Sequence, residues 1–526
     1  MAIRKGQRVL YNEPWVWVLE PAVFAHYCDF CFAALDQHTT AAFEEPNAEE
    51  RDRLSEEHPS KIYCPYCQCA CYCSKTCLAN HAASLHGLEC AYIQRVGASS
   101  MRMLPRSARC VFLALLKVTK GQTDESNIIA EPKAQRTWER LLSHWERFRQ
   151  RTTFMEHACT VHGLIQLLRT EHRFSLEQIC EALGKFAVNA FTIMDRQQNE
   201  VGCGIYLSGS RFDHACRPNA SKYFSGRDLV VYALEDVASL EDVRLSYGVL
   251  YEHPGVRRDE LHEKYHFRCT CAVCGNPQQF RHHEDLMNGW RCQRRASDGA
   301  QCQGLLTLQA ENDAKVWCTD CGWCTADFQI FYENDRTIKE VKEQLLGCVK
   351  LTDNQKRMDV VRMAFAVRID SVPFLSPSNR HLHELNELLT IAAEASQHLG
   401  LALHCCAETL QPYSIIYPEG SFEVLQQVAK FIHLVSRYME KHDNIPKKTA
   451  SFYAGIACIF AHKCEALGVK LPLLPLKVMN VLDRSSVKKH VDVVFNNYLN
   501  QSDIYTVKKL IKIVTAHVQN SKDFSL

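Results

Sequence analysis

Hydrophobic and polar positions follow different periods along this chain, and each period predicts a different kind of element. Near the N-terminus, the runs at 9–11 and 15–19 combine Val, Leu, Tyr and Trp, which favours short strands. Residues 101–185 are predicted to be helical, because their apolar residues recur at helical spacing. Between about 186 and 250, short β-rich runs broken by glycine predict a return to strands. The pattern therefore predicts a mixture of strands and helices in this half of the chain.

From residue 326 to the end, the apolar pattern is helical almost throughout. Amphipathic runs lie around 385–399 and 452–467. A further run places four apolar residues on one helix face: Leu425, Val428, Ile432 and Val435. A solenoid of antiparallel helix pairs would explain these runs, although no repeat consensus is visible. An irregular helical domain explains them equally well, so the sequence leaves both alternatives open.

Composition and length limit the class of protein. A chain of 526 residues is long enough for roughly two to four domains. No signal peptide is expected, because Arg4, Lys5 and Arg8 lead into polar and aromatic residues. The sequence contains no stretch of about twenty uncharged apolar residues, so we do not expect a transmembrane span. We therefore expect an intracellular location, in the nucleus or the cytoplasm, where most of the 27 cysteines stay reduced and can bind metal.

A cysteine-rich module spans residues 28–90 and holds four ordered ligand pairs. They are Cys28-x2-Cys31, Cys64-x2-Cys67, Cys73-x3-Cys77 and His86-x3-Cys90. Cysteine pairs at this spacing can share one tetrahedral Zn²⁺, and the late His-Cys pair would close a second site. The alternative for each cysteine is a buried structural thiol. A charged insertion at 36–60 interrupts the module and is predicted to be an exposed loop.

Three further strings carry candidate chemistry: DHACRPN at 213–219, LSYG at 245–248 and YHFRCTCAVC at 265–274. Together with the module at 28–90, they resemble the SET and MYND domain (SMYD) family of protein-lysine methyltransferases. The resemblance covers residues 1 to about 277 by motif. Beyond that it rests only on helical texture, which resembles the TPR-like C-terminal domain of the family. It implies an α+β multidomain fold whose SET core is rich in β-structure.

The resemblance also implies an order of domains along the chain. They are the N-terminal part of SET at 1–27, a MYND-type zinc finger at 28–90, a helical SET insert at 91–185, the core SET at 186–250, a post-SET zinc cluster at 251–277, a cysteine-rich segment at 278–325 and a helical TPR-like domain at 326–526. The implied activity is S-adenosylmethionine-dependent N-methylation of a protein lysine, on a histone or another protein. The MYND module is expected to bind protein partners, such as proline-rich peptides.

The family pattern implies three zinc sites. In the MYND module the ligands would cross-brace, with Cys28, Cys31, Cys73 and Cys77 on one ion and Cys64, Cys67, His86 and Cys90 on the other. His81 competes with His86, since both fall in one predicted helix, but the family's His-x3-Cys spacing favours His86. The third site would join Cys216 to Cys269, Cys271 and Cys274, tying the post-SET loop to the core. The alternative for Cys216 is simple burial.

Methyl transfer to lysine requires a neutral amine, whereas a free lysine has a pKa of about 10.4. Burial in an apolar channel beside a sulfonium cation would lower that pKa, and alignment of the reacting atoms would supply much of the rate. By resemblance, Tyr247 is the hydroxyl at the methyl-transfer centre and Tyr265 lines the lysine channel. The residues expected around the cofactor are Asn189, Asp213, His214, Tyr247 and Phe267. Taken singly, Tyr247 and Phe267 could equally be core aromatics.

The sequence departs from the family pattern at two informative places. The family carries a GxG turn upstream of the segment that aligns with residues 5–14, and this sequence starts at that segment. Glycines there let the backbone approach the cofactor, so their loss would weaken binding. Asp213 stands where the family has Asn, and an ionised carboxylate accepts hydrogen bonds but cannot donate them. These departures keep a second function open, a SET and MYND scaffold that binds protein partners without catalysis.

Two other expectations complete the reading. The segment with Cys292, Cys302, Cys318 and Cys321 is a candidate fourth zinc ribbon, although its first two cysteines lie far apart, and Cys324 could replace one ligand. The alternative is a reduced cysteine cluster. A sequence-specific DNA-binding zinc protein is disfavoured, because the net charge is only +1 and no basic helix supplies phosphate contacts.

Overall fold

The computed structural model describes residues 2–35, 61–123, 136–168, 171–195, 199–248, 250, 252, 254–295, 299–308, 315–326, 329–348, 351, 353–418 and 420–441. The chain divides into two compact units. The first unit comprises residues 1–213, 220–245 and 260–267, and the second comprises 214–219, 246–259 and 268–526. The predicted loop at 36–60 and the predicted helical run at 452–467 lie outside the described residues. Within the described part, no helix combines the length and the apolar composition needed to cross a membrane.

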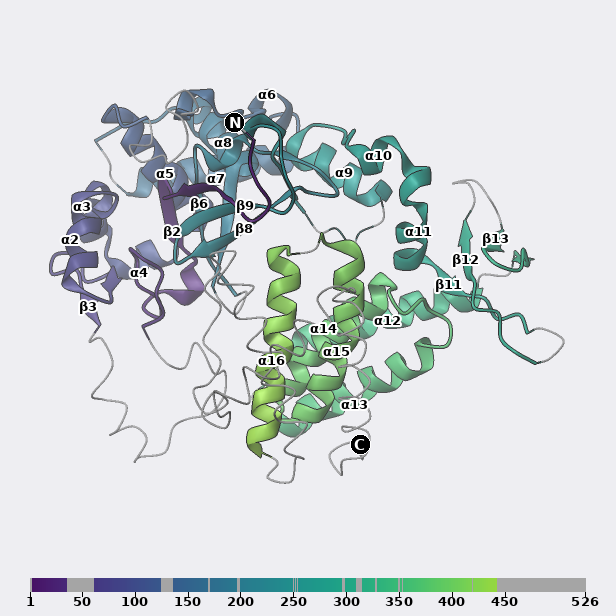
Figure 1. Cartoon of the computed structure of the whole chain (residues 1–526). Helices are drawn as coiled ribbons and strands as arrows, with labels where there is room; N and C mark the ends of the chain where they lie inside the picture. Colours follow the sequence, from purple (N-terminus) through teal and green to yellow (C-terminus); the bar gives the residue numbers. More distant parts are fainter. Residues whose placement is uncertain are drawn as a thin grey trace, which may run out of the picture. The chain divides into compact units, whose positions relative to one another are not determined.

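Two three-stranded antiparallel sheets form the centre of the first unit (Figure 1). In one, β2 (Val16–Leu19) and β5 (Ala190–Met194) flank β6 (Glu200–Ile205). In the other, β1 (Arg8–Asn12) and β8 (Ala220–Ser225) flank β9 (Asp228–Ala233). Every residue of β2 is buried, as its apolar composition predicts. The strands expected at 9–11, 15–19 and between 186 and 250 are thus confirmed.

Helices cover these sheets and build the cysteine module. The α-helices that lie wholly within the described residues of the first unit are α2 (Lys75–Ala83), α3 (His86–Val96), α4 (Ala98–Arg102), α5 (Arg106–Thr119), α6 (Trp145–Phe148), α7 (Thr152–Leu167) and α8 (Leu176–Asn189). Helix α5 packs against β2 and β6 (Figure 1). Helix α8 begins with a capping box, in which Ser175 and Gln178 exchange side chain–backbone hydrogen bonds. The helical structure predicted for residues 101–185 is therefore present.

Short elements connect these parts. They are the strands β3 (Ile62–Tyr63), β4 (Cys71–Tyr72), β7 (Asp213–His214) and β10 (Arg244–Leu245), and the 3-10 helices η1 (Pro21–Val23), η4 (Trp138–Arg140), η5 (Gly209–Arg211) and η6 (Leu240–Asp242). Strands β3 and β4 pair as a hairpin inside the cysteine module. The chain passes between the two units within β7, within α9 (Pro254–Tyr265), and after residues 219, 245 and 267.

The second unit combines a small sheet with a helical domain. After α10 (Ala272–Gly275) and α11 (Pro277–Asn288), the sheet runs in the order β11 (Trp290–Arg291), β12 (Leu305–Leu308), β13 (Val316–Cys318) and β14 (Cys324–Thr325). The helical domain then contains α12 (Gln329–Cys348), α13 (Asn354–Ser371), α14 (Arg380–Ala395), α15 (Leu399–Ile416) and α16 (Phe422–Lys441). Helix α15 packs between α14 and α16 (Figure 1). The mixture of helices and sheets confirms the expected α+β character.

The amphipathic run expected around 385–399 is α14 for most of its length, although α14 ends at Ala395 and α15 begins at Leu399. Gln397 lies between them in the left-handed region, with φ of 63°, which an α-helix does not allow. The face predicted for α16 is present: Leu425 and Val435 are buried and Val428 packs against the same core, while the side chain of Ile432 lies outside the described residues.

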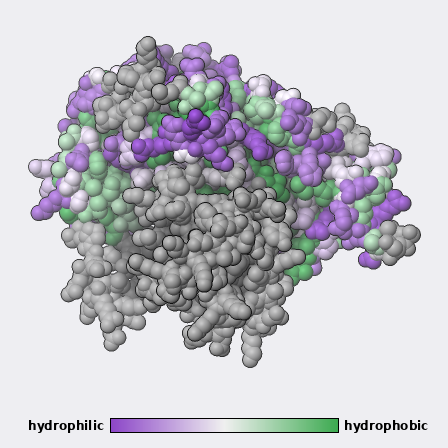
Figure 2. All heavy atoms as spheres, in the orientation of Figure 1, coloured by the Kyte–Doolittle hydropathy of each residue, from purple (hydrophilic) through white to green (hydrophobic). Residues whose placement is uncertain are grey.

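The visible face of the described residues is mainly hydrophilic, with smaller hydrophobic areas between the polar ones (Figure 2). Scattered exposed apolar side chains are normal on a protein surface. Exposed hydrophobicity on this face therefore does not by itself mark a functional site, and the cysteine clusters are the informative features.

Candidate functional site

The first cysteine cluster is assembled by a tight loop and a helix start. Cys28 and Cys31 lie in a turn closed by a hydrogen bond from Phe32 N to Cys28 O, with Phe32 at a φ of 61°. Cys77 lies in the first turn of α2, where its N–H donates to the Ser74 side chain. The four sulfurs of Cys28, Cys31, Cys73 and Cys77 lie within 4.8 Å of one another. Four thiols at this separation fit the donor set of a tetrahedral Zn²⁺.

The second cluster joins the β3–β4 hairpin to helix α3. Cys64 Sγ lies 3.7 Å from Cys90 Sγ, and Cys67 Sγ lies 3.5 Å from His86 Nε2. His86 and Cys90 are one turn apart at the start of α3, so both reach the same side of the helix. The donor atoms of all four residues lie within 4.8 Å of one another, again a set that fits zinc.

His81 and His86 have different environments, and they belong to two helices and not to one. Helix α2 ends at Ala83, and α3 begins at His86. His81 is fully buried, with Nδ1 3.2 Å from the Tyr72 hydroxyl, and burial lowers its pKa well below the ordinary value. His86 alone joins a cluster of donor atoms, as the His-x3-Cys spacing predicted.

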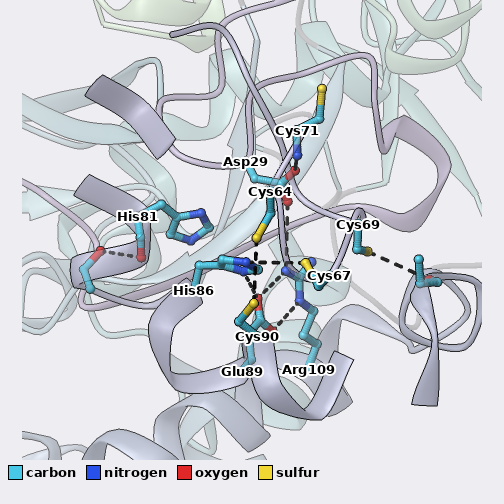
Figure 3. Close-up of polar contacts among 12 residues, drawn as sticks. Asp29, Cys64, Cys67, Cys69, Cys71, His81, His86, Glu89, Cys90 and Arg109 are labelled. Carbon is cyan, nitrogen blue, oxygen red and sulfur yellow. Dashed lines mark hydrogen bonds and ion pairs between the residues drawn. The ribbon is translucent and has the colours of Figure 1, made fainter. Parts of the chain in front are cut away.

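A buried network of charged side chains lies beside the second cluster and contacts His86 (Figure 3). Arg109 donates to both oxygens of Glu89, with Nε–Oε2 and Nη2–Oε1 distances of 3.0 and 2.6 Å. Glu89 Oε1 lies 3.6 Å from His86 Nδ1, the nitrogen that faces away from Cys67. Burial would raise the pKa of the Glu89 carboxyl, but the Arg109 charge and these hydrogen bonds hold it far below its ordinary value. Carboxylates commonly orient a metal-binding histidine in this way.

Asp29 extends the same network toward the first cluster. Its Oδ1 lies 3.9 Å from Arg109 Nη2, and its Oδ2 accepts a hydrogen bond of 2.8 Å from Cys71 N. Burial raises the pKa of Asp29 to about 6, although Arg109 opposes that shift. The sequence reading missed Asp29, Glu89 and Arg109. The available signal was an arginine inside the apolar stretch of α5, where a lone charge needs a buried partner.

The third cluster lies within the second unit. Cys216 Sγ is 3.7 Å from Cys274 Sγ, and Cys216 N lies 3.4 Å from Cys271 Sγ. Together with Cys269, the four sulfurs lie within 4.8 Å of one another, although Cys216 is more than fifty residues away in sequence. This cluster also fits a tetrahedral zinc ion, and it joins two distant chain segments.

His214 connects this cluster to Tyr247. Its Nε2 lies 3.3 Å from Cys216 Sγ, and its Nδ1 accepts a hydrogen bond of 3.1 Å from Tyr247 N. The ring centroids of His214 and Tyr247 are 5.5 Å apart. Tyr247 is half-buried, and Ser246 closes its turn by donating to Gly248 O. The backbone of the predicted catalytic tyrosine is therefore held by the histidine that neighbours the cysteine cluster.

The other predicted site residues belong to the first unit. Asn189 is buried at the end of α8, and its Nδ2 donates to Leu142 O and Lys185 O at 2.9 and 2.8 Å. Asp213 is exposed. Tyr265 and Phe267 are half-buried, with ring centroids 6.4 Å apart. Their roles toward a cofactor stay predictions.

His266, between the two aromatics, was not anticipated. Its φ of 60° places it in the left-handed region, which is uncommon for a residue with a side chain. Its ring packs 4.6 Å from Phe148, and its carbonyl accepts a hydrogen bond of 3.2 Å from Arg147 Nη1. Burial and nearby positive groups lower its pKa to about 4. The turn that carries Tyr265 and Phe267 is thereby fixed to α6.

A fourth cluster is formed by Cys292, Cys302, Cys318 and Cys321, whose sulfurs also lie within 4.8 Å of one another. Cys324 is not part of it. All cysteines in the described part of the chain have free thiols, so none of these clusters is a set of disulfides.

Comparison with known proteins gives a consistent set of relatives. No family model matches the chain. The human histone-lysine N-methyltransferase SMYD3 is 27% identical over 380 residues, which cover 69% of this chain and 72% of that protein. The histone-lysine N-methyltransferase ASHR1 of Arabidopsis thaliana is 22% identical over 387 residues, covering 70% and 75%. The N-lysine methyltransferase SMYD2-B of Xenopus laevis is 24% identical over 287 residues, covering 52% and 56%.

Proposed function

We propose that this chain, which resembles the SET and MYND domain family, is a protein-lysine N-methyltransferase that uses S-adenosylmethionine. Two of these relatives, human SMYD3 and ASHR1 of Arabidopsis thaliana, are histone-lysine N-methyltransferases, and each aligns with about 70% of the chain. The substrate in this proposal is a lysine of a histone or another protein, and the location is intracellular. The observation that carries the proposal is the contact chain from the Cys216 cluster through His214 to Tyr247.

The physical argument starts from the cysteine cluster. Zinc bound by Cys216, Cys269, Cys271 and Cys274 would cross-link two segments that are far apart in sequence, and so restrict their motion. His214 touches Cys216 on one side and holds the backbone of Tyr247 on the other. Restricting these segments keeps the Tyr247 hydroxyl in one place, which is what a positioned displacement reaction requires. In this view the zinc ions are structural and do not act on the methyl group.

The proposed roles of the remaining residues follow from their chemistry. S-adenosylmethionine supplies an electrophilic methyl group on a sulfonium sulfur when it is bound. Tyr247 and Tyr265 would orient the lysine amine and keep it in its neutral form within an apolar channel. Asn189, Asp213, His214 and Phe267 would hold the cofactor. Asp213 suits the positive amino group of the cofactor, since an ionised carboxylate accepts hydrogen bonds from it.

The MYND module is proposed to bind protein partners. Tyr66, in the turn between Cys64 and Cys67, is a large aromatic side chain that is 75% exposed. An exposed aromatic surface suits extended proline-rich peptides, which pay little conformational entropy on binding. Zinc at the first and second cysteine clusters would stabilise the fold of this surface and would take no part in catalysis.

A non-catalytic scaffold is the second candidate function. It is favoured by Asp213, because the family has an amide at this position and an amide can both donate and accept. A scaffold would keep the MYND surface and the zinc clusters while lacking methyl transfer. The two functions therefore differ in a single measurable property.

Methyl transfer from tritium-labelled S-adenosylmethionine to a mixed pool of histones and cell-extract proteins tests the proposal. The wild-type protein should label lysine, and Tyr247→Phe should lower the rate by about 10²-fold, because it removes one positioned hydroxyl. Tyr66→Phe, which takes no part in the reaction in this proposal, serves as the matched control and should keep wild-type labelling. Absence of label with the wild-type protein would favour the scaffold, and unchanged labelling by Tyr247→Phe would remove this tyrosine from the mechanism.

A further inference from the structure

The four-stranded sheet β11–β14 contains a cluster of thiols that the family resemblance does not assign. Cys292 Sγ lies 3.8 Å from Cys321 Sγ, and Cys302 Sγ lies 3.7 Å from Cys318 Sγ. These separations are much longer than a disulfide bond of about 2 Å, and they match sulfurs that share one metal ion. The four donors come from two loops of the same small sheet, the arrangement typical of a zinc ribbon.

The long spacer between Cys292 and Cys302 has a structural explanation. Cys292 N donates to Gly304 O at 2.9 Å, and Cys302 N donates to Arg294 O at 2.8 Å. Arg295 and Gln301 also pair as an antiparallel β-bridge. The described ends of the spacer, 292–295 and 299–302, therefore lie side by side and antiparallel. This pairing brings the two cysteines together, so the spacing that looked unfavourable in sequence does not prevent a shared ligand site.

Backbone N–H groups point at the sulfurs of two cluster members. Gly304 N lies 3.4 Å from Cys302 Sγ, and Cys318 Sγ accepts from Asp320 N at 3.4 Å and Cys321 N at 3.5 Å. Hydrogen bonds of this kind stabilise a thiolate, the form of cysteine that binds metal. Neutral buried thiols would have no need of such a set of donors. The geometry thus points to charged sulfurs at this site.

Two glycines shape the turns around the cluster. A Cβ atom on Gly304 would lie 2.5 Å from Cys318 Sγ and 2.8 Å from Asp320 Cβ, so no other residue fits there without displacing a ligand. Gly322 has a φ of 67°, which glycine adopts readily, and it turns the chain directly after Cys321. Both positions keep the backbone close to the sulfurs, as a compact metal site requires.

The ribbon has too little apolar core to be stable by itself. Among its described residues, the buried apolar side chains apart from cysteine are Leu306 and Val316, with Trp290 and Trp323 packed beside them. Small modules with so little buried surface usually need a metal or disulfides. Since the cysteines are free thiols, a metal is the remaining cross-link.

The ribbon is also bonded to the helical domain of the same unit. Arg291 N donates to Phe374 O at 2.7 Å, and Arg291 Nε donates to Leu375 O at 2.8 Å. Ser376 N donates to Gly289 O at 3.2 Å. These bonds attach the start of the ribbon to the turn between α13 and α14. A rigid ribbon would therefore fix that turn.

From these observations, we propose a fourth structural Zn²⁺ site formed by Cys292, Cys302, Cys318 and Cys321, which holds β11 against the turn between α13 and α14. The site goes beyond the proposed methyl transfer and does not depend on it. It adds a metal-stabilised module between the post-SET cluster and the helical domain.

Metal analysis of the full-length protein tests this site. Purified protein, dialysed against metal-free buffer, should contain about four zinc ions per chain by plasma mass spectrometry, one for each cluster. Cys321→Ser should contain about three, because one thiolate ligand is lost. This residue is exposed, so the exchange leaves the buried side chains unchanged. Hydrogen exchange should then show weaker protection of the amides of Arg291 and Ser376.

Cys324→Ser is the matched control, since Cys324 lies in the same ribbon but outside the cluster. It should keep the wild-type zinc content and the wild-type exchange at Arg291. Gly304→Ala is a second variant, which leaves all thiols in place and should still lower the zinc content. About three ions in the wild type, an unchanged zinc content in Cys321→Ser, or a disulfide found among the four cysteines by mass spectrometry would overturn the proposal.

Discussion

Arg109 and Glu89 form a bidentate ion pair in the interior of the first unit, with the shorter contact at 2.6 Å. Arg109 belongs to α5, which packs against the β-sheet, whereas Glu89 belongs to α3, which carries two ligands of the second cluster. The pair therefore couples the orientation of His86 to the core of the unit (Figure 3). A buried pair of this kind is sensitive to the loss of either partner.

Glu89→Gln should lower the free energy of unfolding of the zinc-loaded protein by about 3 kcal/mol, because it leaves the Arg109 charge buried beside Asp29 alone. It should also weaken zinc binding at the second cysteine cluster by about 10-fold or more, since His86 loses its carboxylate partner. Urea unfolding and chelator competition measure the two effects. Glu171→Gln removes the exposed partner of Arg95 and should change neither. Equal behaviour of the two variants would contradict the assigned role of the network.

Gly202→Ala tests how closely β6 is packed against Val18 of β2 and Phe32 of the cysteine module. Gly202 lies in β6, and a Cβ there would overlap Val18 O and come 2.8 Å from Phe32 Cε2. Overpacking of this kind should destabilise the protein by about 1–3 kcal/mol in thermal or urea unfolding. Gly163→Ala, in the interior of α7 with open space around it, should instead be neutral or stabilising by up to about 1 kcal/mol. The opposite order would show that β6 has room for a side chain at Gly202.

His383 predicts a dependence of stability on pH in the helical domain. It is buried, and burial lowers its pKa to about 3. Glu387 lies 3.6 Å away but accepts a hydrogen bond from Tyr413, and burial raises the pKa of its carboxyl, so it offers little compensating charge. Between pH 6.5 and 3 the unfolded chain binds a proton that the folded chain does not, so stability is lost as the pH falls.

His383→Gln should remove this loss. Between pH 7 and pH 5, the free energy of unfolding of the wild type should fall by roughly 2 kcal/mol more than that of the variant. Urea unfolding at the two pH values measures the difference. His262→Gln, at an exposed position of α9, should behave like the wild type. An equal pH dependence in His383→Gln and the wild type would mean that His383 is not kept neutral.

Much of the site could be predicted from local spacing. The cysteine pairs and His86 lie at separations that only a few turn and helix geometries allow, and the motif at 265–274 led to a family resemblance that the curated relatives confirm. The strands around β2, β6 and β9 were also predictable, because their apolar runs are strong. Cysteine spacings and strongly apolar runs, which are both local in sequence, were therefore the informative patterns.

Contacts between distant segments could not be predicted in the same way. Glu89 and Arg109 are twenty residues apart on separate helices, so no periodicity links them. The approach of Cys292 to Cys302 depends on the antiparallel pairing of Arg295 with Gln301, which has no local sequence signal. The break at Gln397 was missed because the residues on both sides keep the helical apolar pattern. Tertiary packing decides each of these features.

Calorimetric titration of S-adenosylmethionine into the zinc-loaded full-length protein tests the central claim most directly. The account predicts binding with a dissociation constant on the order of 10 µM, and its loss in Cys271→Ser, which opens the cluster behind His214 and Tyr247. The same exchange in the MYND module, Cys77→Ser, should leave cofactor binding intact. No heat from the wild-type protein at high micromolar cofactor, with all its zinc present, would contradict the account.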